Sequence, residues 1–343
     1  LASSVGYTLI NRYFKPTKIS VSAPGKLILF GEHAVVYHKK AIATSLDDLR
    51  ATIDLTLENS SSPVLSMYAP QVDINGLRIP LQELDKIQLS SLVDDILTFT
   101  PKVDDNVLNQ FATLINNTIA SLQVSPLTSN SKVVSMMAAM YLYKYLSRGK
   151  QRRTIRLDLS TTLPIGAGLG SSASFSVCLA TGILAANGYI RQTSDLNATE
   201  LNLINKWAYF CEELIHGTPS GIDNTVATFG GVVSFIKGQT PEKLDTIPGN
   251  LKILIVDTGV PRNTKQLVAG VRERYDQNAE QYKQWMDEIE KCSNDCLDLF
   301  SKMKNNEITP DSYSESLKVL IDNNQRLLVN IGVGHDSLQN IVD

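Results

Sequence analysis

The stretch LPIGAGLGSSAS at 163–174 combines residue types that can hold phosphate. Its glycines allow a backbone to approach an anion closely, and its serines supply hydroxyl groups. It lies between an alternating, strand-like segment at 154–163 and an apolar, helix-like segment at 171–188. The start of a helix offers unpaired N–H groups and a positive dipole end, which favour an anion. Because the stretch matches neither the P-loop pattern nor GxGxxG, a plain turn explains these residues equally well on their own.

A lysine, a glutamate and a histidine gather around one short apolar run in APGKLILFGEHAVVY (23–37). Lys26 follows a glycine at the start of the run, and Glu32 and His33 follow a second glycine at its end. A strand with solvated ends would explain each of these residues singly. Their grouping beside glycines is uncommon in a plain loop and indicates a binding or catalytic site.

Two adjacent glutamates fall on different sides of the helix expected at 199–217. When Ile204 is placed at zero on a helical wheel, Ile215 lies within about 40° of it, Glu212 at roughly 80° and Glu213 nearly opposite. Glu212 is therefore directed toward the protein interior, where a carboxylate needs a cation or a hydrogen-bond donor. A lysine partner and a bound metal ion both satisfy that need.

Asp223 follows this helix in HGTPSGIDNTV (216–226), a segment rich in turn and helix-capping residues. Most aspartates in such segments are caps. Asp223 also comes eleven residues after Glu212, in a chain that carries a phosphate-type loop. The alternative to a cap is therefore that Glu212, Asp223 and the loop hydroxyls line one pocket.

The overall composition restricts the class of protein. The chain has 343 residues, which predicts about two domains, and its net charge is −3, with 32 basic and 35 acidic residues. Nothing in this balance indicates nucleic acid or an anionic membrane as a partner, and no apolar run is long enough to span a bilayer. The N-terminus lacks the pattern of a secretory signal, and the four cysteines form no zinc or disulfide framework. These features predict a cytoplasmic protein.

Hydrophobic patterning predicts a mixed fold of the α+β class with two unequal halves. Strands are expected at 18–25, 51–58, 154–163, 230–238 and 252–259, and helices at 131–149, 171–188, 199–217, 264–304 and 309–331. The polar, proline- and glycine-bearing segment 239–250 is expected to join the halves. The long helices of 264–304 are a candidate face for a homodimer.

Taken in order, three segments resemble the motifs of the GHMP kinase superfamily: APGKLILFGEHAVVY, LPIGAGLGSSASFSV and INKWAYFCEELIHGTPSGIDN. Within it, GEHAVV, KWAY, IHGTPSGIDN and VPRNTKQLVAGVR (260–272) are most similar to the kinases that act on mevalonate. The resemblance is loose over 60–125. It implies the two-domain GHMP kinase fold. An N-terminal, ribosomal protein S5 domain 2-like ATP-binding domain would cover 17–240, and a C-terminal ferredoxin-like α/β domain would cover 250–343.

The same resemblance implies ATP-dependent phosphorylation of the C5 hydroxyl of (R)-mevalonate, a step toward isoprenoids and sterols. Asp223 would act as the general base, and Lys26 beside it would stabilise charge on the phosphoryl group. Lys26, Glu32, His33 and Asp223 would bind the substrate.

The nucleotide and its metal ion are assigned by the resemblance as well. Ser172 and Glu212 would bind Mg²⁺. The ATP-binding residues would be Gly166, Ala167, Gly168, Leu169, Gly170, Ser171, Ser172 and, with a nucleotide contact just before the loop, Thr161.

Two features depart from the superfamily's pattern. A C-terminal glycine-rich motif has no counterpart in the sequence, which ends in GVGHDSLQNIVD, so the second domain is expected to be incomplete. His38-Lys39-Lys40 stands where His-Gly-Lys is usual. Two other functions stay open at this point: another GHMP small-molecule kinase, such as phosphomevalonate kinase, and a ligand-binding protein on the same scaffold without turnover.

Overall fold

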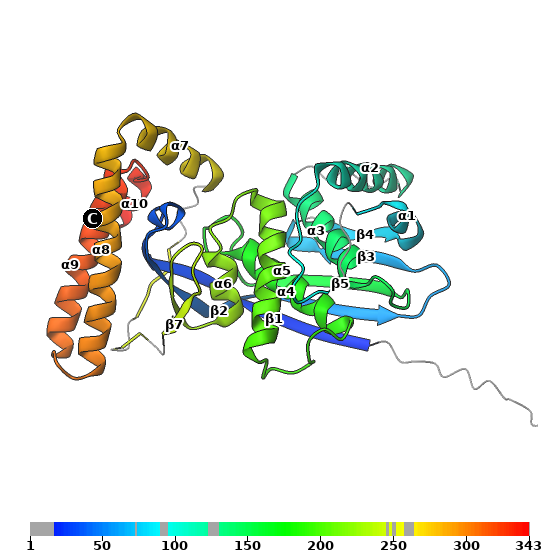
Figure 1. The fold of residues 1–343 in the computed structure, drawn as a ribbon, viewed down its shortest axis with the longest axis horizontal. Helices are drawn as coiled ribbons and strands as arrows, with labels where there is room; N and C mark the ends of the chain where they lie inside the picture. Colours follow the sequence, from blue (N-terminus) through cyan, green and yellow to red (C-terminus); the bar gives the residue numbers. More distant parts are fainter. Residues whose placement is uncertain are drawn as a thin grey trace, which may run out of the picture.

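The computed structural model describes residues 17–72, 74–89, 95–122, 130–244, 247–248, 252–256 and 264–342. The described strands form one mixed seven-stranded sheet in the order β4-β3-β5-β2-β6-β7, with β1 paired to β2 (Figure 1). These strands are β1 (Thr17–Phe30), β2 (Ala41–Glu58), β3 (Val64–Ala69), β4 (Ile74–Pro80), β5 (Thr154–Thr161), β6 (Val232–Phe235) and β7 (Glu242–Leu244).

The helices fall into two groups along the chain. The first group lies along the sheet and comprises η1 (Ala34–Tyr37), η2 (Pro70–Val72), α1 (Leu81–Lys86), α2 (Asp105–Leu122), α3 (Asn130–Leu146), α4 (Ser171–Ala186), α5 (Ala198–His216) and α6 (Ile222–Phe229). The second group stands at one end of the molecule and comprises α7 (Thr264–Gln277), α8 (Ala279–Lys304), α9 (Pro310–Asn330) and α10 (Asp336–Val342).

The long strand β2 changes its pairing partner along its length, and this change determines where the glycine loop leaves the sheet. β1 pairs along its length, whereas β5 pairs with its second half and β6 with its first half. Between these two partners the register of β1 and β2 shifts, since Pro24 faces Arg50 whereas Gly25 faces Leu46. The extra residues 47–49 form a bulge, which interrupts pairing and bends the strand. The glycine loop that follows β5 therefore leaves the sheet at the point where β2 changes partner.

Helix α4 lies at the centre of the N-terminal half. Of its 16 residues, 12 are buried, among them Phe175, Val177 and Ile183. It packs against β1 and β2 as well as against α5 and α6, which explains why its sequence is apolar all round instead of on one stripe. Its first turn is thereby fixed relative to β1.

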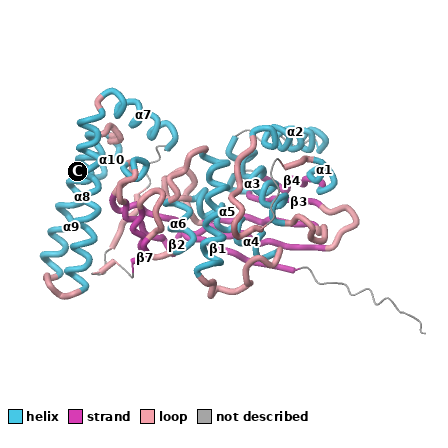
Figure 2. Tube along the Cα trace, viewed as in Figure 1, coloured by secondary structure: helices cyan, strands magenta, loops and turns pink. Residues whose placement is uncertain are grey.

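A second apolar core joins the far end of β1 to the C-terminal helices. Phe30 and Ile42 of the sheet belong to the same buried cluster as Met286 and Ile289 of α8 and Leu327 of α9. Figure 2 shows α8 and α9 side by side at this end, apart from the helices that cover the rest of the sheet. The segment that follows β1 is thus enclosed from the side of the C-terminal helices.

Most of the predicted elements are present, and the α+β class is confirmed. The alternating segment 18–25 and the apolar run after it form the single strand β1, because the register shift lets the chain continue past Pro24. The helix expected over 264–304 is two helices that meet at Asn278. Strands β3 and β4 lie in 60–80, where no element was predicted.

One predicted strand is wrong where the structure can test it. Residues 252–256 of the expected strand 252–259 have no strand structure and are exposed, Leu254 to 87%. A strand needs a hydrogen-bonding neighbour, and none of the described strands pairs with this segment. Residues 257–259 lie outside the described part of the chain.

The division into domains at 17–240 and 250–343 stays a prediction. In the described residues beyond 250, regular structure is helical. Across the described residues, no helix combines the length and the apolar character required to cross a membrane.

Replacing Gly25 by alanine should destabilise the protein by roughly 1–3 kcal/mol. A Cβ at this position would collide with Leu163 Cδ2 and would lie 2.9 Å from the Leu169 carbonyl oxygen, which is backbone and cannot move away easily. The matched control is Gly270→Ala in α7, where a Cβ meets only the end of the flexible Arg274 side chain, at 3.3 Å. Urea unfolding should show a clear loss for the first variant and a change of at most about 1 kcal/mol for the second; equal shifts would contradict the packing argument.

Candidate phosphoryl-transfer site

An ion pair between Lys26 and Asp223 forms the centre of the candidate site. Lys26 Nζ lies 3.2 Å from Asp223 Oδ1, and the two side chains are 10% and 32% exposed. Lys26 comes from the middle of β1, and Asp223 from the first turn of α6, whose N-cap residue is Gly221. A largely buried ammonium group requires a counter-charge, which this carboxylate supplies. Asp223 is therefore not the helix cap that its surroundings in the sequence suggested.

The glycine loop is attached to β1 directly beside this ion pair. The backbone N–H of Lys26 donates to the Leu169 carbonyl at 2.9 Å, and Ser174 Oγ donates to the Pro24 carbonyl at 2.6 Å. Gly170 has φ +77°, and a Cβ there would lie 2.8 Å from Lys26 Cγ. Only glycine therefore fits at this position, because it adopts the required φ and leaves room for the Lys26 side chain.

The first turn of α4 is open to an anion. Its N-cap residue Gly170 provides no side-chain hydrogen bond, and Ser171 and Ser172 are only partly buried. Gly166 and Gly168 of the preceding loop also have positive φ, so the loop turns repeatedly over a few residues. Backbone N–H groups and a helix dipole directed at one point make a phosphate site. The loop and the Lys26–Asp223 pair meet here, as the pocket hypothesis requires.

Glu212 faces the same helix from α5. It is 3% exposed, and it accepts a hydrogen bond from Ser176 Oγ at 2.9 Å and one from Ser172 Oγ at 3.3 Å. Its neighbour Glu213 is half-buried. The helical-wheel prediction that Glu212 is the inward-facing glutamate is confirmed, although Glu213 is less exposed than predicted.

Burial raises the pKa of Glu212 from 4.5 to about 7. This net value also includes the Asp223 charge, which raises the pKa, and the hydrogen bonds from Ser176 and Ser172 and the Lys26 charge, which lower it. The two carboxylates and the ammonium group thus lie close enough to influence one another. Because two carboxylates share one cation here, the site can accommodate additional positive charge.

His216 is a site residue that the sequence analysis missed. Its Nε2 lies 3.0 Å from Ser172 Oγ and 3.7 Å from Glu212 Oε2. Burial lowers its pKa, and the nearby Asp223 charge opposes that effect. The signal was present in the sequence, because a histidine four residues after Glu212 lies on the same side of the helix.

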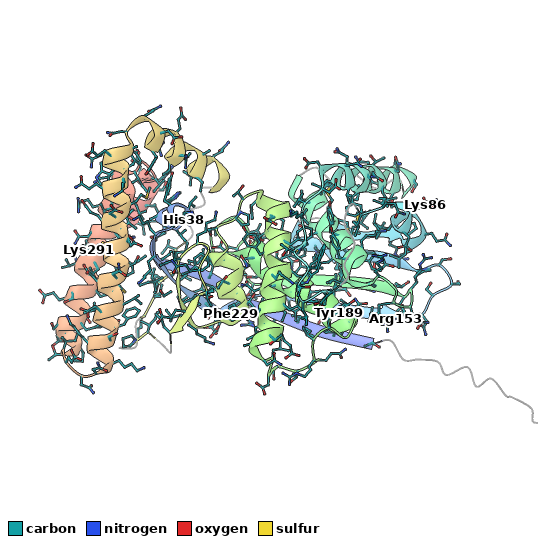
Figure 3. All side chains as sticks on the ribbon, in the orientation of Figure 1. His38, Lys86, Arg153, Tyr189, Phe229 and Lys291 are labelled. Carbon is teal, nitrogen blue, oxygen red and sulfur yellow. The ribbon has the colours of Figure 1, made fainter. Side chains whose placement is uncertain are left out.

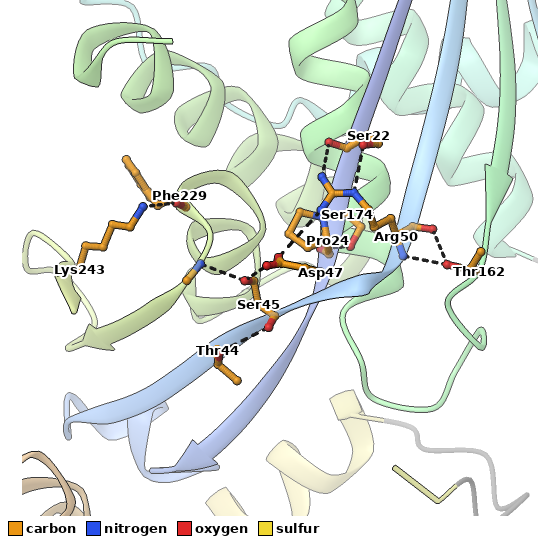
Figure 4. Close-up of polar contacts among 11 residues, drawn as sticks. Ser22, Pro24, Thr44, Ser45, Asp47, Arg50, Thr162, Ser174, Phe229 and Lys243 are labelled. Carbon is orange, nitrogen blue, oxygen red and sulfur yellow. Dashed lines mark hydrogen bonds and ion pairs between the residues drawn. The ribbon is translucent and has the colours of Figure 1, made fainter. Parts of the chain in front are cut away.

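Thr161, the last residue of β5, is held by two hydrogen bonds at the start of the glycine loop. Thr161 Oγ1 donates to the Arg50 carbonyl at 3.3 Å and accepts from the Leu163 N–H at 3.0 Å. Figure 4 shows Arg50 at the β2 bulge with its guanidinium on Ser22 and its backbone N–H on Thr162. These bonds fix the start of the loop. A nucleotide contact from Thr161 stays a prediction.

Glu32 and His33 follow β1 directly but are held by a different part of the chain. Glu32 accepts a hydrogen bond of 3.0 Å from Asn324 Nδ2 of α9. His33 has φ +60°, an uncommon value for a residue other than glycine. They come just after the end of β1, the strand that carries Lys26, at the side of the C-terminal helices. Their proposed contact with substrate is likewise untested.

The donor set near α4 fits a magnesium ion shared with phosphates. Among the described residues, no group of three or more His, Cys, Asp or Glu side chains could hold a metal by itself. Mg²⁺ in phosphoryl-transfer sites, however, typically takes one or two protein oxygens together with phosphate oxygens and water. Ser172 Oγ and Glu212 Oε2 are such a pair, and a buried carboxylate with a raised pKa gains from a cation.

Comparison with known proteins agrees with this geometry. The sequence profile described as "GHMP kinases N terminal domain" matches residues 132–231, which include the glycine loop, Glu212 and Asp223. The fold and the site therefore define a GHMP kinase.

Full-length relatives narrow the assignment. Mevalonate kinase of Mus musculus is 36% identical over 330 residues, covering 94% of this chain and 79% of the relative. Mevalonate kinase of Homo sapiens is 37% identical over 335 residues, covering 94% and 78%. Among solved structures, the mevalonate kinase of Methanococcus jannaschii has a TM-score of 0.61 at 21% identity, covering 95% of this chain and 83% of that one. The chain belongs to the mevalonate kinase family.

In the absence of metal, Glu212→Gln should raise the free energy of unfolding by an amount that increases with pH. The folded state binds the Glu212 proton more tightly than the unfolded chain, so wild-type stability falls as pH rises from about 4.5 through about 7. A glutamine keeps one of the two oxygens that accept hydrogen bonds from Ser176 and Ser172, and it carries no charge. The variant should therefore gain on the order of 2–3 kcal/mol relative to wild type between pH 4.5 and pH 8 in EDTA.

Denaturant unfolding at a series of pH values checks this expectation. Glu213→Gln is the control, because that half-buried group should give a smaller pH dependence. A difference between wild type and Glu212→Gln that stays constant with pH would show that the Glu212 carboxylate is not destabilised by burial.

Proposed function

We propose that this protein transfers the γ-phosphoryl group of ATP to the C5 hydroxyl of (R)-mevalonate. The observation that carries the proposal is the Lys26–Asp223 ion pair beside the open N-terminus of α4, in a chain of the mevalonate kinase family. A basic side chain, a carboxylate and a phosphate-type loop within one site are the parts that phosphoryl transfer requires. The solved structure of L. major mevalonate kinase in complex with R-mevalonate has the same fold, with 20% identity and a TM-score of 0.57.

The ATP phosphates bind at residues 166–172 in this proposal, where backbone N–H groups of the loop and of α4 face the anion. Ser172 and Glu212 hold Mg²⁺, which neutralises phosphate charge and orients the nucleotide. The hydroxyl groups of Ser172 and Ser176 keep Glu212 in its inward position. Thr161 contacts the nucleotide just before the loop.

Asp223 acts as the general base. It accepts the proton of the C5 hydroxyl while that oxygen forms its bond to the γ-phosphorus, and the bond from the γ-phosphorus to the bridging oxygen of ADP breaks. Lys26, 3.2 Å from Asp223, stabilises the charge on the oxygen that attacks and on the phosphoryl group. Glu32 and His33 contact the substrate and hold it in line with the phosphate.

The setting of the enzyme is also part of the proposal. All four cysteines are free and buried, which fits a reducing compartment such as the cytoplasm. A homodimer through 264–304 stays a prediction. The apolar side of α8 packs against other parts of the same chain, so a dimer would have to use the remaining surface of this helix. Outward-facing pairs such as Lys283–Asp287 and Lys291–Asp295 give the rest of α8 a solvated character.

The acceptor is tested by incubating the chain with Mg·ATP and either (R)-mevalonate or 5-phosphomevalonate. Formation of ADP and 5-phosphomevalonate from the first acceptor, with no turnover of the second, is the expected result. Turnover of phosphomevalonate instead would identify another GHMP kinase activity, and ATP binding without ADP formation would identify a binding protein.

Asp223→Asn should lower kcat by about 10²–10⁴-fold while the Kd for Mg·ATP changes little. Asparagine preserves the shape of the side chain and a hydrogen-bond acceptor for Lys26, so that the buried ammonium group keeps a partner, but it takes up no proton. Steady-state kinetics together with nucleotide titration give both quantities. Turnover close to that of wild type would exclude Asp223 as the base.

Glu212→Gln should weaken Mg·ATP binding, whereas Glu213→Gln should leave it nearly unchanged. The first variant removes the charge that attracts the metal ion, and the second removes the charge of the half-buried neighbour, about 100° round the helix. Titration of a fluorescent ATP analogue with and without Mg²⁺ separates metal-dependent from metal-independent affinity. Similar losses in both variants would contradict the assignment of Glu212 to the metal ion.

A further inference from the structure

Asn324 connects the C-terminal helices to the residues that follow β1. It lies in α9, is 5% exposed, and donates from Nδ2 to Glu32 Oε2 at 3.0 Å. The two residues are 292 positions apart in the sequence. The amide orientation follows from chemistry, since a carboxylate only accepts and its partner must present the NH₂ group.

The position of Asn324 on its helix is otherwise apolar. The other buried residues of α9 are Tyr313, Leu317 and Leu327, which belong to the second core. A polar amide among them costs free energy unless it is hydrogen-bonded, and an aliphatic side chain would pack there without that requirement. The bond to Glu32 satisfies the amide nitrogen, whereas Asn324 Oδ1 is buried without a hydrogen-bond partner among the described residues. An asparagine that is kept here at that cost fits a role for its bond to Glu32.

The segment around Glu32 is held in an unusual conformation by several such contacts. His33 and His38 both have φ near +60°, a backbone conformation that persists only where the surroundings enforce it. Lys39 forms ion pairs with Asp287 and Glu290 of α8. The departure from the usual His-Gly-Lys pattern at Lys39 therefore adds a contact to the C-terminal helices. Figure 3 shows the neighbouring His38 beside this helical end.

We propose that Asn324 is a positioning residue for the substrate: by donating to Glu32 it fixes the carboxylate that contacts mevalonate. Without this bond, the Glu32 side chain loses a buried donor that favours one of its rotamers. Substrate affinity then depends on a residue of α9 that itself belongs to neither the nucleotide loop nor the Lys26–Asp223 pair. This inference rests on the proposed function, since it takes Glu32 as a substrate contact.

Asn324→Asp is the primary test, because it changes the donor to a second carboxylate facing Glu32. We expect the Kd and KM for (R)-mevalonate to rise about tenfold to a hundredfold, with KM for ATP and kcat changed less than about twofold. Asn323→Asp introduces the same charge at the adjacent, half-buried position, about 100° round the helix, and should leave mevalonate affinity nearly unchanged.

Asn324→Leu is the second test, which still gives a result if Asn324→Asp does not fold. Leucine removes Asn324 Oδ1, which is unpaired within the described part of the chain, but also takes away the donor to Glu32, so the two effects on stability oppose each other. This variant should therefore unfold close to the wild-type temperature and still bind mevalonate about tenfold or more weakly. Retained stability with lost affinity is a combination that a purely structural role of Asn324 would not produce.

A double-mutant cycle ties the effect to Glu32. In a Glu32→Gln background, Asn324→Asp should cause little or no further loss, because the glutamine amide can donate to the new carboxylate. The same penalty in both backgrounds, or equal rises in KM for ATP and mevalonate, would overturn the inference.

Failure of this inference can be told apart from failure of the proposed function. Normal turnover of mevalonate in every Asn324 variant would overturn only the inference about Asn324. Failure of the wild type to bind or phosphorylate mevalonate would overturn the proposed function and the inference together.

Discussion

Lys26 and Asp223 are held 3.2 Å apart where β1, α6 and the start of α4 meet, and the arrangement of the site follows from keeping these two charges together. The ammonium group is largely removed from water, so any change that separates the pair leaves a buried charge uncompensated. Gly170 must be glycine for the Lys26 side chain to pass, and the loop must lie against β1 for its carbonyl to accept the Lys26 N–H. The phosphate-type loop and the acid–base residue are therefore positioned by a common constraint.

The fold provides this meeting point by a change of partner in one strand. β2 pairs with β5 in its second half and with β6 in its first half, and the bulge at 47–49 lies between them. The glycine loop leaves the sheet at this break, and α4 returns over it with an open N-terminus. Glu212 then approaches α4 from α5 and adds a carboxylate that lacks a full counter-charge. These separate features meet at one place, where we propose that phosphate and a divalent cation bind.

Local patterns in the sequence predicted those features that depend on one element at a time. The 3.6-residue period selected Glu212 over Glu213, and alternation located β5 and residues 51–58 of β2. Contacts between distant segments left no such pattern. The bond from Asn324 to Glu32 depends on how α9 packs against the segment after β1, which the sequence of one helix does not specify. The spacing of His216 and Glu212 puts both on one side of α5, but the contact of His216 with Ser172 also depends on how α5 packs against α4. The segment 252–256 looked like a strand because its residues are apolar, but strand formation also requires a neighbour.

The roles given to Lys26, Asp223 and the loop share one claim, namely that the acceptor hydroxyl and the transferred phosphate meet between them. A crystal structure of this chain with (R)-mevalonate, Mg²⁺ and a non-hydrolysable ATP analogue tests it most directly. The account predicts the C5 hydroxyl within about 2.6–3.2 Å of an Asp223 carboxylate oxygen, with the γ-phosphate at the first turn of α4. A mevalonate bound with its C5 hydroxyl away from Asp223, or phosphates bound away from residues 166–172, would contradict it.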